Sequence, residues 1–248
     1  MQPTYIPWLG YFDMIDSVDI FVLLDNVQLA KRSWQVRNRI KSPNGELYLT
    51  IPVKKDKGRR ETLLNNALVN DEENWRANHI KSIEHNYRKQ FQKFPELRHL
   101  LYELVNFNSQ ILAEINTNII QQISRLVGIK TRFIRASELG NSDKTKDSLL
   151  LEICEKLNCS EYLSPQGSAV YIDAETPGGV FTGSKCELFY HHYAHPEYQQ
   201  IQTGPFLPYM SIIDLLLCSG PVSALEIIRR GRRPKIHYKD FAGAGNAT

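Results

Sequence analysis

Apolar residues follow two periodicities along the chain and divide its first part into strand-like and helix-like segments. Residues 19–25 form a continuous apolar run with an aspartate at each end, DIFVLLD, which is typical of a strand buried on both faces in a parallel sheet. Just before it, residues 9–16 predict a short helix. Farther along, apolar residues alternate on both sides of Asn44-Gly45, and this pattern predicts a β-hairpin.

The spacing becomes helical over residues 71–128. Trp75, His79 and Tyr87 follow an acidic first turn at helical intervals. Pro95 interrupts the pattern, and Gly128 ends the last of the helical stretches.

In the remaining sequence, strand and helix patterns alternate. Predicted strands cover residues 131–136, 162–164 and 187–193, and predicted helices cover residues 142–157, 211–217 and 221–230. This alternation favours an α/β fold with a mostly parallel sheet, a β-hairpin insertion and a helical middle segment. We expect a single domain over residues 1–230, with a helical insertion at about 71–128, followed by a tail over 231–248.

The composition changes this picture little. The 248 residues are 42% hydrophobic and 23% charged, as in an ordinary globular protein. A net charge of +3 is too small to argue for a nucleic-acid partner, and the basic residues that matter gather between residues 31 and 60.

Targeting and metal-binding signals are missing from the sequence. The four cysteines form no CxxC pair, no signal peptide opens the chain, and the apolar run over residues 212–218 is too short to span a bilayer. We therefore expect a reduced, cytoplasmic protein with no metal ion and no cofactor. Because Pro3 and Pro7 keep the opening extended, as after a strand, we also expect the native start to lie upstream.

The signatures of common enzyme classes are also missing. The sequence contains no GxGxxG, GxxxxGK[ST], GxSxG or HExxH motif. Any chemistry must be sought in less familiar segments.

The first such segment is QPTYIPWLGYF, which begins at Gln2. Its rings offer flat faces for a nucleobase or a sugar, on a loop that two prolines hold in place: Tyr5, Trp8 and Tyr11. A tightly packed loop beneath a sheet is the structural alternative.

The second segment runs from Asp25, at the carboxyl end of the predicted buried strand, to Lys41. Its guanidinium, amide and ammonium groups suit phosphate, pyrophosphate or carboxylate: Gln28, Arg32, Arg37, Asn38, Arg39 and Lys41. In a strand, Arg37, Arg39 and Lys41 would share one face, with Asn38 on the other. The alternative is an edge strand that uses charge to avoid pairing.

The other candidates are histidines and a carboxylate. His79, on the helix that carries Tyr87, could act as a general base or could be structural. His195 lies in the densest histidine cluster, where no ligand geometry specifies zinc. Asp214 interrupts an apolar helix, so it must be hydrogen-bonded or paired, either in a site or with a basic group such as Arg39.

Two long motifs carry a family resemblance. The opening QPTYIPWLGYF…DIFVLLDNVQ…WQVRNRIK and the closing HPEYQQ…FLPYMSIIDLLLCSGP resemble those of WbqC-like proteins, as does the middle stretch WRANHIKSIEHNYRK. The similarity covers the chain from residue 2 to about residue 228. The departures are Leu29, where the family often has an aromatic residue, and Val36, where a polar residue is more usual.

The resemblance implies a role in O-antigen or related surface-polysaccharide biosynthesis. It suggests N-acylation, including aminoacylation, of a nucleotide-linked amino-dideoxy sugar. The acyl donor stays open among a thioester, an acyl carrier protein, an aminoacyl-tRNA and a free amino acid with ATP. Apart from such a tRNA, we expect no nucleic-acid partner.

This reaction needs a base, donors for the oxyanion and a cationic cradle for the diphosphate. The candidates for the base are His79, His195 and Asp25, and Asn38 or Gln28 could bind the oxyanion. The substrate-binding candidates comprise the cradle, the stacking rings and neighbouring polar groups: Arg37, Arg39, Lys41, Tyr5, Trp8, Tyr11, Gln2, Gln28, Tyr87 and Asp214.

Three alternatives remain. A glycosyltransferase of the same pathway normally has a metal-binding acidic pair, and the chain contains no DxD motif. A nucleotidyl-transferring enzyme needs an ATP-phosphate signature, which is missing. A non-catalytic protein that binds sugar nucleotides would explain the lack of known catalytic motifs.

Overall fold

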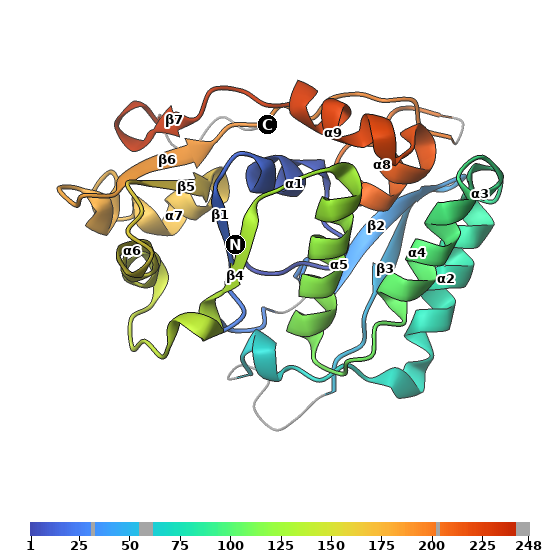
Figure 1. Cartoon of the computed structure of the whole chain (residues 1–248), viewed down its shortest axis with the longest axis horizontal. Coiled ribbons are helices and arrows are strands. Elements are labelled where there is room, and N and C mark those ends of the chain that lie inside the picture. Colours follow the sequence, from blue (N-terminus) through green and yellow to red (C-terminus); the bar gives the residue numbers. More distant parts are fainter. Residues whose placement is uncertain (31–32, 55–61, 202–203, 242–248) are drawn as a thin grey trace. The chain divides into compact units, whose positions relative to one another are not determined.

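The computed structural model describes residues 1–30, 33–54, 62–201 and 204–241, and divides into two compact units (Figure 1). One unit comprises Met1–Arg135 and His195–Arg230, and the other comprises Ala136–Ala194 and Gly231–Thr248. Every predicted site residue in the described part of the chain lies in the first unit. Arg32 falls outside the described residues. That the two units act as one domain stays a prediction.

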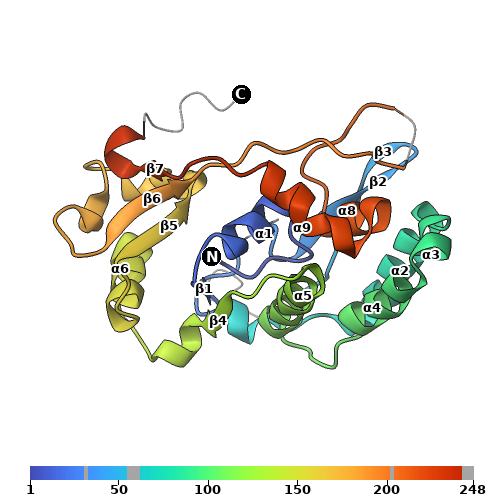
Figure 2. The same ribbon diagram turned by 45° about the horizontal axis from the view of Figure 1, so that its top comes forward.

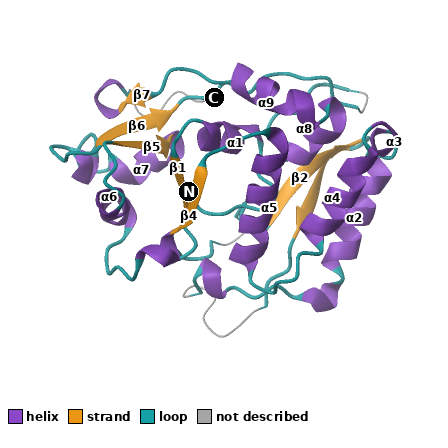
Figure 3. Ribbon diagram, viewed as in Figure 1, coloured by secondary structure: helices purple, strands orange, loops and turns teal. Residues whose placement is uncertain are grey.

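A pair of parallel strands lies in the first unit. β1 (Ile20–Leu23) pairs with β4 (Arg132–Arg135), with Ile20 opposite Arg132 (Figure 3). The predicted strand is confirmed, but its predicted burial on both faces is wrong. Phe21 and Leu23 are buried, whereas the alternate residues are only half-buried, because the sheet has two strands.

The predicted β-hairpin is confirmed. β2 (Arg37–Ser42) pairs antiparallel with β3 (Gly45–Thr50), which places Arg39 opposite Tyr48. Gly45 has φ of 102°, a conformation that glycine adopts without a steric penalty. Ile40 and Leu49 bury one face of the hairpin against the core.

Helices surround these strands in the first unit. They are α1 (Leu9–Asp16), α2 (Trp75–Asn86), α3 (Gln90–Lys93), α4 (Pro95–Val105), α5 (Leu112–Val127), α8 (Ile212–Ser219) and α9 (Pro221–Arg230). As predicted, Pro95 separates two helices because proline fits the first helical position, and Gly128 ends α5 in a left-handed conformation.

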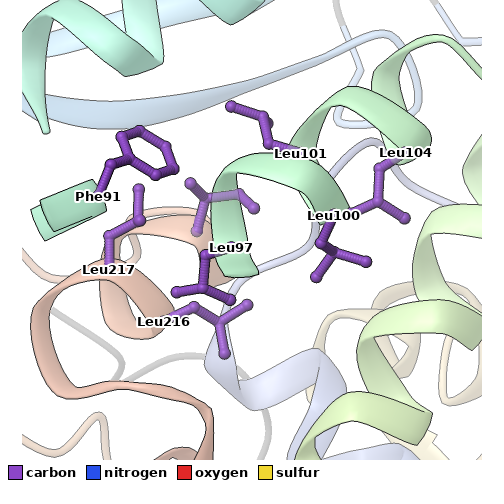
Figure 4. A pocket seen from close by; sticks show the side chains of 8 residues that line it. Phe91, Leu97, Leu100, Leu101, Leu104, Leu216 and Leu217 are labelled. Carbon is purple, nitrogen blue, oxygen red and sulfur yellow. The ribbon is translucent and has the colours of Figure 1, made fainter. Parts of the chain in front are cut away.

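The leucine-rich sides of α4 and α8 meet Phe91 of α3 around a void of about 10 Å³ (Figure 4). Its lining is entirely apolar, and its volume is about that of one water molecule. The void is therefore a packing gap in the core and offers no binding site.

The second unit has its own sheet. β5 (Glu161–Pro165) and β6 (Glu187–His191) are parallel, and β7 (Ile236–His237) is antiparallel to β6. β7 lies in the segment expected to be a tail. α6 (Lys146–Lys156) and α7 (Ala169–Ile172) belong to the same unit.

The structure is therefore mixed α/β, as predicted, but the described strands form three small sheets instead of one mostly parallel sheet. Among the described strands, β2 and β3 pair only with each other, and β1 pairs only with β4. None of the helices in the described part of the chain has the length and apolar character needed to cross a membrane.

A strained bend at Ile6 brings the opening segment onto the hairpin. Ile6 has φ of 41°, which is rare for a β-branched residue. The buried Asn38 amide holds this bend, because its Nδ2 donates to the carbonyls of Tyr5 at 3.0 Å and Ile6 at 2.7 Å. Its Oδ1 accepts from the Arg39 N–H at 2.9 Å.

We predict that Asn38→Ala lowers the free energy of unfolding by about 1–3 kcal/mol, because it leaves buried carbonyls without donors at a strained residue. Urea denaturation measures the change. Asn106→Ala, at an exposed position after α4, is the control and should change the stability by no more than about 0.5 kcal/mol. Equal effects of the two substitutions would contradict this account of the bend.

Candidate functional site

Three segments far apart in the sequence meet beside the hairpin in the first unit. Trp8, which follows the Ile6 bend, forms a β-bridge with Ser211. The Ser211 N–H donates to the Arg39 carbonyl at 2.9 Å, and the Ile212 N–H donates to the Pro7 carbonyl at 2.8 Å. These bonds join the opening loop, β2 and the loop before α8, which lies near the hairpin in Figure 2.

His195 lies in this region among aromatic rings. Its ring is stacked on Trp8, with centroids 5.9 Å apart and planes 11° apart. Tyr209 packs edge-on at 5.2 Å, and Phe206 lies at 5.6 Å. Burial among these rings lowers the pKa of His195, so the imidazole is neutral at pH 7.

The hydrogen bonding of His195 defines which nitrogen can accept a proton. Nδ1 lies 2.9 Å from the Pro196 carbonyl, which can only accept, so Nδ1 carries the hydrogen. Nε2 is buried and has no hydrogen-bond partner within the described structure. The neutral ring therefore presents an unused lone pair, which a general base requires.

The outer face of the hairpin carries two of the predicted cradle arginines. We call this surface, formed by Trp34, Arg37, Arg39, Glu46 and Tyr48, the arginine face. Arg39 Nη1 donates to both carboxylate oxygens of Glu46, at 2.7 and 2.8 Å, and its Nε reaches the Tyr209 carbonyl at 3.4 Å. Arg37 makes no ion pair with any described residue, and its Nε is buried without a hydrogen-bond partner.

The third predicted cradle residue, Lys41, is buried. Its Nζ donates to the Pro205 carbonyl at 2.9 Å, and its backbone N–H donates to the Tyr87 hydroxyl at 3.1 Å. In this conformation Lys41 connects β2 to the loop before α8 and does not belong to the arginine face.

Asp214 is fully buried in α8 and accepts three hydrogen bonds. The donors are the Tyr87 hydroxyl at 2.5 Å, the Tyr198 hydroxyl at 2.7 Å and Gln200 Nε2 at 2.9 Å. Burial raises the pKa of the Asp214 carboxyl, and the three donors partly offset this effect. As expected, the carboxylate is hydrogen-bonded, but to these side chains, while Arg39 pairs with Glu46.

His79 uses both ring nitrogens in packing. The Thr50 carbonyl, 3.1 Å from Nε2, can only accept, so Nε2 carries the hydrogen and Nδ1 accepts from the Tyr5 hydroxyl at 2.8 Å. Tyr5 has no exposed surface and His79 is 5% exposed. Burial lowers the pKa of His79 from its ordinary 6.5 to about 4.

The other predicted residues lie in the core or after the carboxyl end of β1. Tyr11 is buried and donates to the Gln2 carbonyl at 2.9 Å. Asp25 is buried just after β1, and its carbonyl accepts from the Asn65 N–H at 2.9 Å, whereas Gln28 is exposed. The structure thus brings Trp8, Arg39 and His195 together.

Several side chains around His195 and Asp214 were not predicted: Tyr198, Gln200, Phe206 and Tyr209. The sequence could have indicated them, because all four lie in the closing motif, HPEYQQ…FLPYMSIIDLLLCSGP, that carries the family resemblance. A groove of about 440 Å³ beside α2 and α4 contains none of the predicted site residues. No group of three or more potential metal ligands occurs within the described residues.

The pKa of His79 predicts how the stability changes with pH. The unfolded chain takes up a proton at about pH 6.5, but the folded ring resists protonation until about pH 4, so the free energy of unfolding falls as the pH falls through this range. The total loss from His79 should be on the order of 3 kcal/mol. Urea denaturation at several pH values measures it.

His79→Gln should remove the His79 contribution and make the slope shallower, while the contributions of other groups whose pKa burial lowers, such as His195, remain. His85→Gln, at an exposed position on the same helix, should keep the slope of the unsubstituted protein. An unchanged slope in His79→Gln would show that His79 is not held neutral.

Comparisons with known proteins identify the family of this chain. The model of the WbqC-like protein family matches residues 2–225. The chain is similar to "Uncharacterized protein Rv1507c" of Mycobacterium tuberculosis (strain ATCC 25618 / H37Rv), with 32% identity over 222 residues, which cover 89% of this chain and 92% of that protein. No solved structure matches significantly. The chain belongs to the WbqC-like protein family.

Proposed function

We propose that this protein is a transferase of surface-polysaccharide biosynthesis that N-acylates, or aminoacylates, a nucleotide-linked amino-dideoxy sugar. The observation that carries the proposal is the neutral His195, whose Nε2 has a lone pair and no partner in the described structure. The resemblance to WbqC-like proteins suggests the substrate class, and the arginine face carries groups that suit its diphosphate.

In this reaction His195 acts as the general base. The sugar amine attacks the carbonyl carbon of an activated acyl donor, a carbon–nitrogen bond forms, and Nε2 takes the amine proton. The bond from the carbonyl carbon to the donor's sulfur or oxygen then breaks with its electron pair, and the protonated His195 returns the proton to that leaving group. The lowered pKa of His195 keeps the base unprotonated at neutral pH.

We assign the base to His195 and not to His79 or Asp25. Both nitrogens of His79 are already bonded inside the protein, to Tyr5 and Thr50. Asp25 is buried just after β1, and its backbone carbonyl accepts a hydrogen bond from the Asn65 N–H. Of the three, His195 is next to Tyr209, whose carbonyl binds a cradle arginine.

For the diphosphate, we assign the leading role to Arg37 and a second role to Arg39. Arg37 has no carboxylate partner among the described residues, so its charge is available for a phosphate. Arg39 would exchange part of its interaction with Glu46 for the ligand. Asn38, whose amide holds the Ile6 bend and so places Trp8, acts in this proposal as a positioning residue.

The test is turnover of dTDP- and UDP-linked 4-amino-4,6-dideoxyhexoses with a panel of acyl and aminoacyl donors, with the N-acyl product detected by mass spectrometry. We predict that His195→Gln lowers kcat by about 10²- to 10⁴-fold with little change in KM, because glutamine cannot take the proton. In the unsubstituted protein, kcat/KM should fall at acid pH only below about 6.5, because the pKa of His195 lies below its ordinary value.

His99→Gln, at an exposed position on α4, is the matched control and should keep full activity. An N-acyl product formed equally well by His195→Gln would contradict the assignment of the base. Binding of the amino sugar without turnover by any donor would favour a sugar-nucleotide-binding protein. Sugar transfer that depends on a divalent metal would favour the glycosyltransferase alternative.

A further inference from the structure

We propose that Trp34 and Tyr48, together with Arg37, bind a nucleoside diphosphate, with the base on the two rings and the diphosphate on the guanidinium. The inference rests on the proposed function, because it takes the nucleoside diphosphate to be part of a sugar nucleotide. Its test measures binding and requires no turnover. It locates the half of the substrate farthest from the reacting amine.

The two rings are exposed although both are large and apolar. Trp34 lies in the turn before β2 and is 46% exposed, and Tyr48 lies on β3 and is 44% exposed. Their planes are 17° from parallel, and their centroids are 6.5 Å apart. A pair of nearly parallel, partly exposed rings on a hydrogen-bonded hairpin is suited to stacking on a planar base.

The three rings that the sequence predicted for stacking are less available to a nucleobase. Tyr5 and Tyr11 are buried in the core, and their hydroxyls are bonded to His79 and to the Gln2 carbonyl. Trp8 already stacks on His195. The exposed stacking surface therefore lies on the hairpin.

Arg37 gives this surface its preference for an anion. Its guanidinium carbon lies 5.9 Å from the Trp34 ring centre and 5.2 Å from that of Tyr48. Arg39 is also near Trp34, at 5.6 Å, but its charge is balanced by Glu46. Arg37 forms no ion pair with the described residues, and its buried Nε lacks a hydrogen-bond partner. A phosphate would balance the charge of Arg37 and would accept a hydrogen bond from its Nε.

The size and charge of this surface favour one nucleotide over a nucleic-acid strand. A strand is bound along a row of cations and rings, whereas this surface has one unbalanced guanidinium, and the net charge of the chain is only +3.

The arginine face also connects to the proposed base. Arg39 contacts both Trp34 and Tyr209, because its guanidinium lies over the Trp34 ring and its Nε donates to the Tyr209 carbonyl. The Tyr209 ring in turn packs on His195 at 5.2 Å. A nucleotide whose base lies on Trp34 can therefore direct its diphosphate along the arginines and its sugar toward His195.

Isothermal titration of UDP, dTDP and inorganic pyrophosphate into the full chain tests this inference. Trp34→Ala should weaken the binding of both nucleotides by about ten-fold or more and leave pyrophosphate unchanged. Trp34→Phe should restore most of the affinity, because it keeps a stacking ring. Arg37→Gln should weaken nucleotides and pyrophosphate alike.

Tyr102→Ala removes a tyrosine of similar exposure, 42%, from α4 and should change none of these affinities. The inference is overturned if Trp34→Ala and Tyr48→Ala bind nucleotides normally, if the unsubstituted protein binds neither nucleotide, or if a single-stranded oligonucleotide binds far more tightly than UDP. If Trp34→Ala still catalyses N-acyl transfer as well as the unsubstituted protein does, this subsite alone is rejected. Nucleotide binding that depends on Trp34, without turnover by any donor, would reject the proposed function alone.

Discussion

The buried carboxylate of Asp214 is the constraint on which the arrangement of the site depends. A buried charge is costly unless donors surround it, and here the donors come from the end of α2 and from the loop before α8. Tyr87 also accepts from the backbone of Lys41, so the same network reaches β2. Because Tyr198 and Gln200 are held in this way, the loop that carries His195 and its aromatic neighbours is tied to the core.

The site contains three departures from ordinary packing, although buried side-chain atoms without a partner among the described residues also occur elsewhere in this unit, such as Asn116 Oδ1 and Thr117 Oγ1. Ile6 has a strained backbone, and two buried nitrogens, His195 Nε2 and Arg37 Nε, have no hydrogen-bond partner among the described residues. Such features cost free energy in the folded state and persist only where the surroundings impose them. In the site, the three departures lie on segments that Trp8, Ser211 and β2 join, and the proposed ligand site rests on this arrangement.

Local patterns predicted the elements well, because their causes are local. The helix over residues 9–16, the hairpin turn at Asn44-Gly45 and the last helix from Pro221 follow from periodicity, turn chemistry and the fixed φ of proline. Sheet architecture was less predictable, because the apolar run around Phe21 does not reveal how many strands pair beside it. The sequence also did not show which rings are exposed: Tyr5 is buried and Tyr48 is exposed, although both are tyrosines followed by an aliphatic residue.

The central claim is that His195 is a neutral imidazole with its hydrogen on Nδ1 and a free lone pair on Nε2. The most direct measurement is a nitrogen-15 NMR spectrum of the histidine-labelled protein at pH 7, with the His195 signals assigned from the spectrum of His195→Gln. The account predicts a protonated Nδ1 and an unprotonated Nε2, with protonation of the ring only below its ordinary pKa of 6.5. A ring that carries its hydrogen on Nε2, or one that is already doubly protonated at pH 7, would contradict it.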